Sequence, residues 1–156
     1  MTPAIDLLNA LNINYTLHEY EHDSGASSYG LEAAVKLNIA PEKVFKTLVL
    51  DAGNKNLVVA VLPVNRQLNL KRMAKAIGAK KVTMAEPLAV SRSSGYILGG
   101  VSPLGQKRLL NTVVDELAIN QSTIFVSGGR RGLEIELKVE DLLAAIKAET
   151  AAIAEP

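Results

Sequence analysis

One lysine of this chain stands out because it lies in the middle of an apolar run of strand-forming residues. The run covers residues 44–50, and the two-residue period of a strand places Lys46 on the same face as Val44, Leu48 and Leu50. An ammonium group beside apolar neighbours either reaches water along its four-carbon stem or stays in a cleft, where desolvation lowers its pKa. In a cleft, the amine would be available for chemistry. The simpler explanation is a lysine near a strand edge that prevents pairing with another chain and so protects against aggregation.

Two glycine-rich stretches could bring backbone N–H groups to a ligand. Residues 99–103, Gly-Gly-Val-Ser-Pro, lack side chains at two consecutive positions, so a carbonyl or phosphate oxygen could approach backbone donors. Residues 127–132, Ser-Gly-Gly-Arg-Arg-Gly, could hold an anion near two guanidinium groups. A bend at a sheet corner and a hairpin turn explain the two stretches as well, and the sequence leaves both interpretations open.

The signatures of common hydrolases are incomplete or missing. Around Ser102, the nucleophile-elbow pattern G-x-S-x-G would need glycine where Leu104 stands, and Pro103 would disturb the turn. The two histidines, His18 and His22, are not spaced as in an H-E-x-x-H helix, and the chain has no cysteine. We therefore expect structural or surface roles for both histidines, no metal site, no cofactor and no cysteine nucleophile.

The composition is that of an ordinary globular domain. The chain has 156 residues, of which 48% are hydrophobic and 21% charged, with a net charge of +1. We expect one core and a single domain over residues 1–156. The charge is not that of a general nucleic-acid binder, although basic and acidic residues are segregated enough to permit a phosphate-facing side. No signal segment or apolar run of about 20 residues is present, and with no cysteine the expected location is the cytoplasm.

Hydrophobic periodicity and turn residues predict the elements that must position these groups. Helices are expected over residues 3–11, 32–37, 70–77, 86–90 and 139–146. Strands are expected over residues 15–20, 44–50, 57–62, 81–84, 96–98, 111–114, 123–126 and 133–137. Thr2 and Asn69 are predicted as N-caps, and Gly78 as a C-terminal stop.

The connections between these elements indicate the fold class. A turn over residues 51–56 joins two strands as an antiparallel hairpin, and the second strand is apolar on both faces, as in a sheet interior. Residues 21–30 are expected to form a surface loop and residues 148–156 a fraying tail. Together the elements predict an α+β fold with a mainly antiparallel, barrel-like sheet flanked by helices.

No single stretch identifies a protein family, but an ordered set of stretches along the chain does. The set consists of Thr2-Pro3-Ala4-Ile5-Asp6-Leu7-Leu8, Tyr20 with His22-Asp23, Phe45-Lys46-Thr47-Leu48, Leu68-Asn69-Leu70-Lys71, Gly95-Tyr96 with residues 99–107, and residues 126–133. Together they resemble the YbaK family of cysteinyl-tRNA(Pro) deacylases, which are similar to the editing domain inserted in bacterial prolyl-tRNA synthetases. The resemblance spans nearly the whole chain and implies a mixed α/β domain with a barrel-like sheet.

The resemblance also implies a set of site residues. The family's essential lysine falls on Lys46, and its glycine-x-x-x-proline loop falls on residues 99–103. The substrate-binding positions fall on Tyr20, Tyr29, Thr47, Ser102, Pro103 and Ser127. At position 29 we expect phenylalanine in close relatives, and the hydroxyl of Tyr29 changes the polarity of the pocket.

The implied reaction is hydrolysis, in trans, of the ester that joins a wrong amino acid, first of all cysteine, to the 3′ end of tRNA(Pro). Lys46 would bind the terminal ribose or phosphate and orient the ester, and the N–H groups of Gly99 and Gly100 would stabilise the oxyanion. The substrate thiol or water would attack. Removal of alanine or serine by the same fold, and a non-catalytic module that binds a nucleotide or tRNA end, are the alternatives. Mischarged tRNA(Pro) is the expected partner, and prolyl-tRNA synthetase is an open second one.

Overall fold

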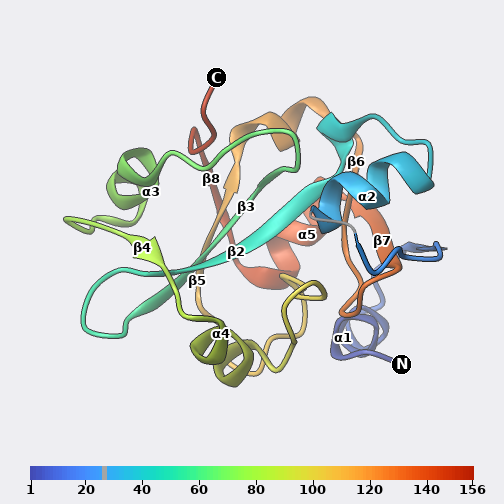
Figure 1. The fold of residues 1–156 in the computed structure, drawn as a ribbon, viewed down its shortest axis with the longest axis horizontal. Coiled ribbons are helices and arrows are strands. Elements are labelled where there is room, and N and C mark those ends of the chain that lie inside the picture. Colours follow the sequence, from blue (N-terminus) through green and yellow to red (C-terminus); the bar gives the residue numbers. More distant parts are fainter. Residues whose placement is uncertain (26–27) are drawn as a thin grey trace.

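The computed structural model describes residues 1–25 and 28–156 (Figure 1). The helices are α1 (Pro3–Ala10), α2 (Tyr29–Lys36), α3 (Leu70–Ile77), α4 (Pro87–Ser94) and α5 (Val139–Ile146), with short 3-10 helices η1 (Pro41–Lys43) and η2 (Glu116–Asn120). The strands are β1 (Thr16–Glu19), β2 (Phe45–Asp51), β3 (Leu57–Pro63), β4 (Thr83–Met84), β5 (Asn111–Asp115), β6 (Thr123–Ser127), β7 (Leu133–Lys138) and β8 (Glu149–Ala151). None of the helices in these ranges is both long and apolar enough to cross a membrane.

The strands form two sheets. One has five strands in the order β4-β2-β3-β5-β8, and the other has three in the order β1-β7-β6. Parallel pairing occurs between β3 and β5 and between β5 and β8, whereas the other pairs are antiparallel. The α+β class and the mainly antiparallel pairing are confirmed. Because the described strands lie in two sheets that do not close, the term barrel-like applies only loosely.

The hairpin of β2 and β3 crosses the middle of the molecule, with α3 and β4 at one end and α2 and β6 at the other (Figure 1). As predicted, β3 is buried along nearly its whole length. Strand β4 pairs with β2 only at Leu50 and Asp51, so the first half of β2 has β3 as its ladder partner on one side only. At this end an isolated bridge between Val44 and Phe125 joins the two sheets. Lys46 therefore lies at a sheet edge, next to the junction.

Helices cover the sheets and bury three apolar clusters. The largest cluster combines α1 and α5 with residues from both sheets, including Leu8, Phe45 and Leu142. A second lies under α3, around Met73, and a third lies under α2, around Ala33. The third cluster contains both residues of the bridge between the sheets, so α2 is packed directly over the junction.

Local signals place the helix ends correctly. The Thr2 hydroxyl accepts a hydrogen bond from the Ile5 N–H, and the Asn69 side chain accepts one from the Arg72 N–H, as expected of N-caps. Gly78 ends α3 with a left-handed φ of 72°. The predicted loop over residues 21–30 includes residues 26–27, which lie outside the described residues, and α2 begins inside that loop, at Tyr29.

The predicted strand over residues 96–98 is wrong. Helix α4 continues to Ser94, whose hydroxyl donates to the Val90 carbonyl, and Gly95 then turns the chain with a left-handed φ of 84°. Tyr96 is buried, and its hydroxyl donates to the Leu104 carbonyl at 2.6 Å. The side chain of Tyr96 therefore closes a loop instead of lying in a strand.

The fraying tail predicted over residues 148–156 is also wrong. This segment contains β8, which pairs with β5, and Ile153 is completely buried. The carboxylate of Asp115 accepts hydrogen bonds from the N–H groups of Ile153 and Ala154, both at 3.0 Å. An alanine-rich sequence gives no local sign of such an anchor, because the partner lies almost 40 residues earlier in the chain.

Candidate active site

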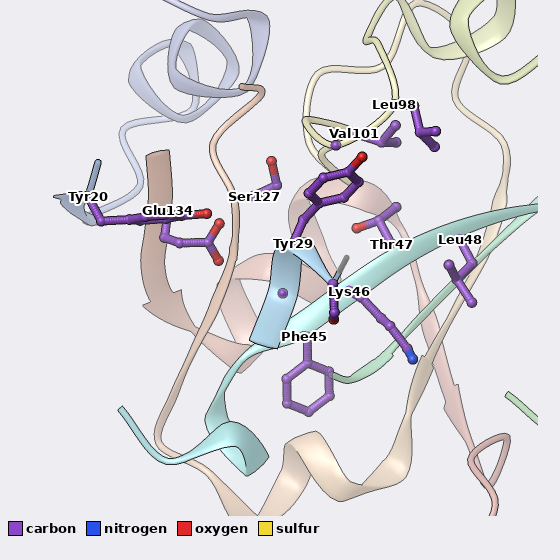
Figure 2. Close-up of a pocket in the computed structure, with 13 residues that line it drawn as sticks. Tyr20, Tyr29, Phe45, Lys46, Thr47, Leu48, Leu98, Val101, Ser127 and Glu134 are labelled. Atoms are coloured by element: carbon purple, nitrogen blue, oxygen red, sulfur yellow. The ribbon is translucent and has the colours of Figure 1, made fainter. Parts of the chain in front are cut away.

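A pocket with a volume of about 280 Å³ lies at the junction of the two sheets (Figure 2). Its walls come from the start of β2, the first turn of α2, the loop after α4, and the facing ends of β6 and β7. The structure brings together six of the nine predicted site residues as lining of this pocket: Tyr20, Tyr29, Lys46, Thr47, Gly99 and Ser127. Their roles in binding and catalysis remain predictions.

Lys46 enters the site from the open edge of β2. Figure 2 shows its side chain and that of Thr47 on opposite sides of the strand, as the alternation predicts. The ammonium group is half-buried, and this desolvation lowers the pKa of Lys46. Among the ion pairs found within residues 1–25 and 28–156, none involves Lys46. Its charge is therefore available to an anionic group of a ligand.

Thr47 supplies an unused polar atom. Its Oγ1 is buried and has no hydrogen-bond partner among the described residues, although the residue lines the pocket. Buried hydroxyl groups are normally hydrogen-bonded, because burying one without a partner is unfavourable. A ligand that fills the pocket could provide the missing partner.

The two glycines of the loop differ in their surroundings. Gly99 has a left-handed φ of 92°, and a Cβ atom at this position would lie 3.4 Å from the ring of Tyr29. At Gly100 a Cβ would lie 2.8 Å from the Cα of Arg130, so this position needs glycine for close backbone packing. The N–H of Gly100 donates to the Ile97 carbonyl at 3.0 Å. Gly99 is therefore the better placed of the two predicted N–H donors.

The other two predicted loop residues lie behind the pocket. Ser102 is fully buried, and its Oγ accepts a hydrogen bond from the Leu104 N–H at 3.2 Å. Pro103 lines a separate cavity beside Leu7 and Ala145. Neither residue is part of the pocket lining, so any effect on a substrate would pass through the shape of the loop.

Sequence reasoning missed Glu134, a carboxyl group that lines the pocket. The residue lies on β7 opposite Ser127 of β6, is 7% exposed, and has its pKa raised to about 8 by burial. The pKa of Tyr20 is raised by burial and by the charge of Glu134, and Figure 2 shows the two side chains side by side. Alternation along β7 places Glu134 and Glu136 on the same face of the sheet, so the sequence does not distinguish them. In the folded structure, other elements cover Glu134 but not Glu136.

Both arginines of the turn between β6 and β7 lie next to carboxylate groups. Arg130 Nη2 lies 3.6 Å from Glu19 Oε2, and Arg131 Nη2 lies 3.1 Å from Glu32 Oε1. Both guanidinium groups thus have carboxylate partners, which favours the interpretation of residues 127–132 as a structured hairpin turn. His18 is likewise engaged outside the pocket, with its Nε2 3.0 Å from Glu136 Oε1.

Comparisons with known proteins identify relatives of the chain. The chain is 40% identical over 136 residues to a protein of Enterococcus faecalis named "Putative Cys-tRNA(Pro)/Cys-tRNA(Cys) deacylase EbsC", which covers 86% of this chain and 83% of that protein. It is 28% identical over 147 residues to "Prolyl-tRNA editing protein ProX" of Acetoanaerobium sticklandii, with 90% and 87% covered. The solved structure of "hypothetical protein APE2540" has the same fold, with a TM-score of 0.87, 24% identity, and 98% and 99% of the two chains covered.

The family assignment rests on a match over most of the chain. A model of the aminoacyl-tRNA editing domain matches residues 24–145, a range that includes the pocket residues except Tyr20. This match and the Enterococcus faecalis relative confirm the resemblance that the ordered sequence motifs indicated. The chain belongs to the aminoacyl-tRNA editing domain family.

Proposed function

We propose that this protein is a trans-editing hydrolase that removes cysteine from mischarged Cys-tRNA(Pro), with residues 1–156 acting as one editing domain. One observation carries the proposal: a cavity of about 280 Å³ adjoins Lys46, whose half-buried ammonium group takes part in none of the ion pairs among the described residues. Such a cavity accommodates an aminoacyl group while the tRNA remains outside. The name of the Enterococcus faecalis relative supports the same substrate class.

The pocket residues have distinct roles in this proposal. Lys46 binds the terminal ribose or phosphate and orients the ester, and the Gly99 N–H stabilises the developing oxyanion. Gly100 keeps the loop against the backbone of Arg130, and its N–H joins the oxyanion site if the turn to Ile97 opens. The remaining predicted residues shape the space for the aminoacyl side chain: Tyr20, Tyr29, Thr47 and Ser127 by contact, and Ser102 and Pro103 through the loop.

The substrate's own thiol is the proposed nucleophile. The chain has no cysteine, and a cysteine thiol is far more nucleophilic than a hydroxyl group and is partly ionised at neutral pH. As the sulfur–carbon bond forms, the ester carbon–oxygen bond breaks, and the thiol proton passes to the departing 3′-hydroxyl of the tRNA. Water then opens the strained thiolactone to release cysteine.

A single-turnover comparison of three substrates tests this function. Saturating protein is mixed with Cys-tRNA(Pro), Ser-tRNA(Pro) or Ala-tRNA(Pro), and release of the amino acid is measured. Cysteine should leave fastest, and serine much more slowly, because its side chain is nearly isosteric but weakly nucleophilic. Equal rates for cysteine and serine would identify water as the nucleophile. Faster release of alanine would identify Ala-tRNA(Pro) as the preferred substrate. Binding of all three without release would leave a non-catalytic module.

Mischarged tRNA(Pro) is the proposed partner, and its place of synthesis makes the cytoplasm the proposed location. Prolyl-tRNA synthetase is a second proposed partner, because it produces and releases the mischarged tRNA. If the two proteins act together, adding an editing-inactive synthetase should increase the rate of deacylation at limiting tRNA. An unchanged rate would mean that the protein captures its substrate from solution.

A further inference from the structure

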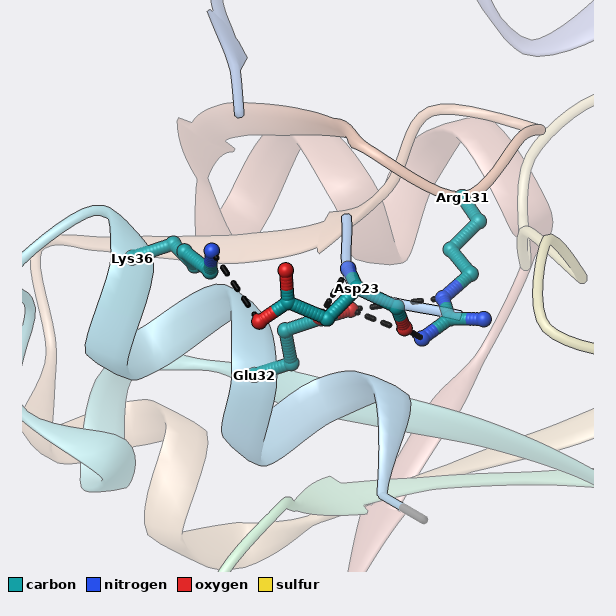
Figure 3. A network of polar contacts seen from close by, with 4 residues as sticks. All are labelled: Asp23, Glu32, Lys36 and Arg131. Carbon is teal, nitrogen blue, oxygen red and sulfur yellow. Dashed lines mark hydrogen bonds and ion pairs between the residues drawn. The ribbon is translucent and has the colours of Figure 1, made fainter. Parts of the chain in front are cut away.

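A buried ion pair outside the pocket joins three segments that are far apart in the sequence (Figure 3). Oε1 of Glu32 accepts hydrogen bonds from Nε and Nη2 of Arg131, at 3.3 and 3.1 Å. Oε2 accepts one from the Asp23 N–H at 2.7 Å, and the Asp23 carbonyl accepts one from Arg131 Nη2. One carboxylate and one guanidinium group thus connect the chain at Asp23, the first turns of α2, and the turn between β6 and β7.

The same guanidinium group stacks on a wall of the pocket. Cζ of Arg131 lies 4.5 Å from the ring centroid of Tyr29, the first residue of α2. The ring of Tyr29 also lies beside the loop, since a Cβ at Gly99 would be 3.4 Å from it. Planar guanidinium groups suit this arrangement, since they can stack on a ring and hydrogen-bond a carboxylate at the same time.

The surroundings of the ion pair indicate a geometric role. Glu32 and Arg131 are 5% and 18% exposed, and their charges cancel, so the pair offers little attraction to tRNA phosphate. Buried ion pairs often stabilise a fold less than apolar side chains of similar volume would. The guanidinium group held in this pair lies over the Tyr29 ring. A pocket that must distinguish small aminoacyl groups depends on where its walls stand.

We propose that Arg131 is a positioning residue that fixes the Tyr29 ring as a pocket wall and thereby sets which aminoacyl esters are cleaved. This inference rests on the proposed function for its substrate class. The correctly charged product, prolyl-tRNA(Pro), carries a ring that the pocket must exclude, whereas cysteine must enter. A displaced Tyr29 ring would slow the cleavage of cysteinyl esters and admit the larger prolyl group.

Two variants change this contact while the fold is kept. Arg131→Lys retains a charge opposite Glu32 but loses the planar group over Tyr29. The double variant E32Q/R131Q removes both charges together, so that no uncompensated carboxylate remains buried. The neighbouring pair of Arg130 and Glu19 is exposed, with 57% and 69% of the side chains accessible, and supplies the matched controls R130K and E19Q/R130Q.

The expected result is a changed substrate ratio in folded protein. Both Arg131 variants should cleave Cys-tRNA(Pro) about tenfold to a hundredfold more slowly than wild type, because small displacements of reacting groups reduce rates strongly. The ratio of rates for cysteinyl and prolyl esters should fall in both, whereas a general loss of folded protein would reduce the two rates equally. The controls should retain the wild-type rates and ratio. A wild-type ratio in both Arg131 variants would overturn the proposal.

NMR signals of the tyrosine rings test the positioning role of Arg131 independently of activity. Selective ring labelling of the four tyrosines gives one set of ring NMR signals for each. In the Arg131 variants the Tyr29 signals should shift and change in line width, while those of Tyr15 stay unchanged as an internal reference. If wild-type protein releases no amino acid, the proposed function fails and the ring signals alone decide the inference. Unchanged Tyr29 signals in both variants would overturn the positioning role.

Discussion

Two buried carboxyl groups of this protein have opposite surroundings. Asp115, 1% exposed, accepts hydrogen bonds from the N–H groups of Ile153 and Ala154 on one oxygen and from the Leu117 N–H on the other. Glu134, 7% exposed, lines the pocket, and its pKa is raised to about 8 by burial, with no hydrogen bond or neighbouring charge among the described residues to offset the shift. The Asp115 carboxylate therefore has all its hydrogen-bond partners within the chain, whereas the pocket leaves the Glu134 carboxyl without one among the described residues.

Other polar groups extend the contrast. The hydroxyl of Thr47 has no hydrogen-bond partner among the described residues, and Lys46 takes part in no ion pair among them. The Thr47 hydroxyl, the Lys46 ammonium group and the Glu134 carboxyl all line one cavity. A buried hydroxyl without a partner is unusual in a native protein, and here it lies in the same cavity as two groups whose pKa values are shifted by burial, so the cavity is a candidate site for an external ligand.

The largest expected effect is on activity, at Lys46. Lys46→Ala should slow deacylation of Cys-tRNA(Pro) about a hundredfold or more, because one electrostatic contact in an active site is worth roughly 3 kcal/mol. The melting temperature should stay near that of wild type, since no ion pair is broken. The exposed neighbour Lys43 supplies the control K43A. Turnover near the wild-type level in K46A would remove Lys46 from the mechanism.

The reverse result is expected at Asp115. Asp115→Ala leaves three backbone N–H groups without their acceptor and should lower the free energy of unfolding by about 3 kcal/mol. Denaturant unfolding measures this loss, and the deacylation rate per folded molecule should not change. A large loss of activity in folded D115A would show that the Asp115 region and the pocket are coupled, and would contradict a purely structural role for Asp115.

At Glu134 the expected effect is on the pH dependence of stability. Because the folded pKa, about 8, lies above the ordinary value of 4.5, this group stabilises the fold fully below pH 4.5, and the contribution is lost as pH rises towards 8. Glu134→Gln should therefore melt above wild type at pH 8, by about 2–4 °C per kcal/mol removed, and close to it at pH 4.

Glu136 supplies the matched control on the same face of β7. Hydrogen bonds from Thr123 and His18 lower the pKa of Glu136, with burial acting in the opposite direction, so E136Q should not gain stability at high pH. Identical pH profiles for E134Q and wild type would mean that the pKa of Glu134 is not raised in the folded protein.

The smallest expected effect is at Thr47. Thr47→Val replaces a buried, unpartnered hydroxyl by a methyl group and should raise the free energy of unfolding by about 1 kcal/mol. If a substrate supplies the missing partner, the same change should lower kcat/KM for deacylation. Stabilisation without any loss of kcat/KM would place Thr47 outside the substrate contacts.

Short-range signals predicted much of the fold. The N-caps at Thr2 and Asn69, the stop at Gly78 and the apolar strand β3 depend on neighbours within a few residues. Such signals are present in the sequence itself, because caps and alternation reflect local hydrogen bonding and side-chain direction. The same is true of Lys46, whose position among apolar residues was already unusual in the sequence.

Long-range contacts account for what was missed. Tyr96 leaves the strand conformation because its hydroxyl reaches Leu104, and residues 148–156 are ordered because Asp115 binds their backbone. Glu134 is buried only because β7 is covered at that point and not at Glu136. In each case the deciding partner belongs to another element, and no pattern within the segment indicates it.

The isolated bridge between Val44 and Phe125 affects how the two sheets can move. Lys46 and Thr47 belong to the five-stranded sheet, whereas Ser127 and Glu134 belong to the three-stranded one, so the pocket spans a seam closed by this bridge and by packing. A ligand that contacts residues of both sheets would restrict the motion of one sheet relative to the other. Backbone amide hydrogens near Val44 and Phe125 should then exchange with solvent more slowly when the pocket is filled. Exchange of these amide hydrogens therefore reports whether the pocket is occupied.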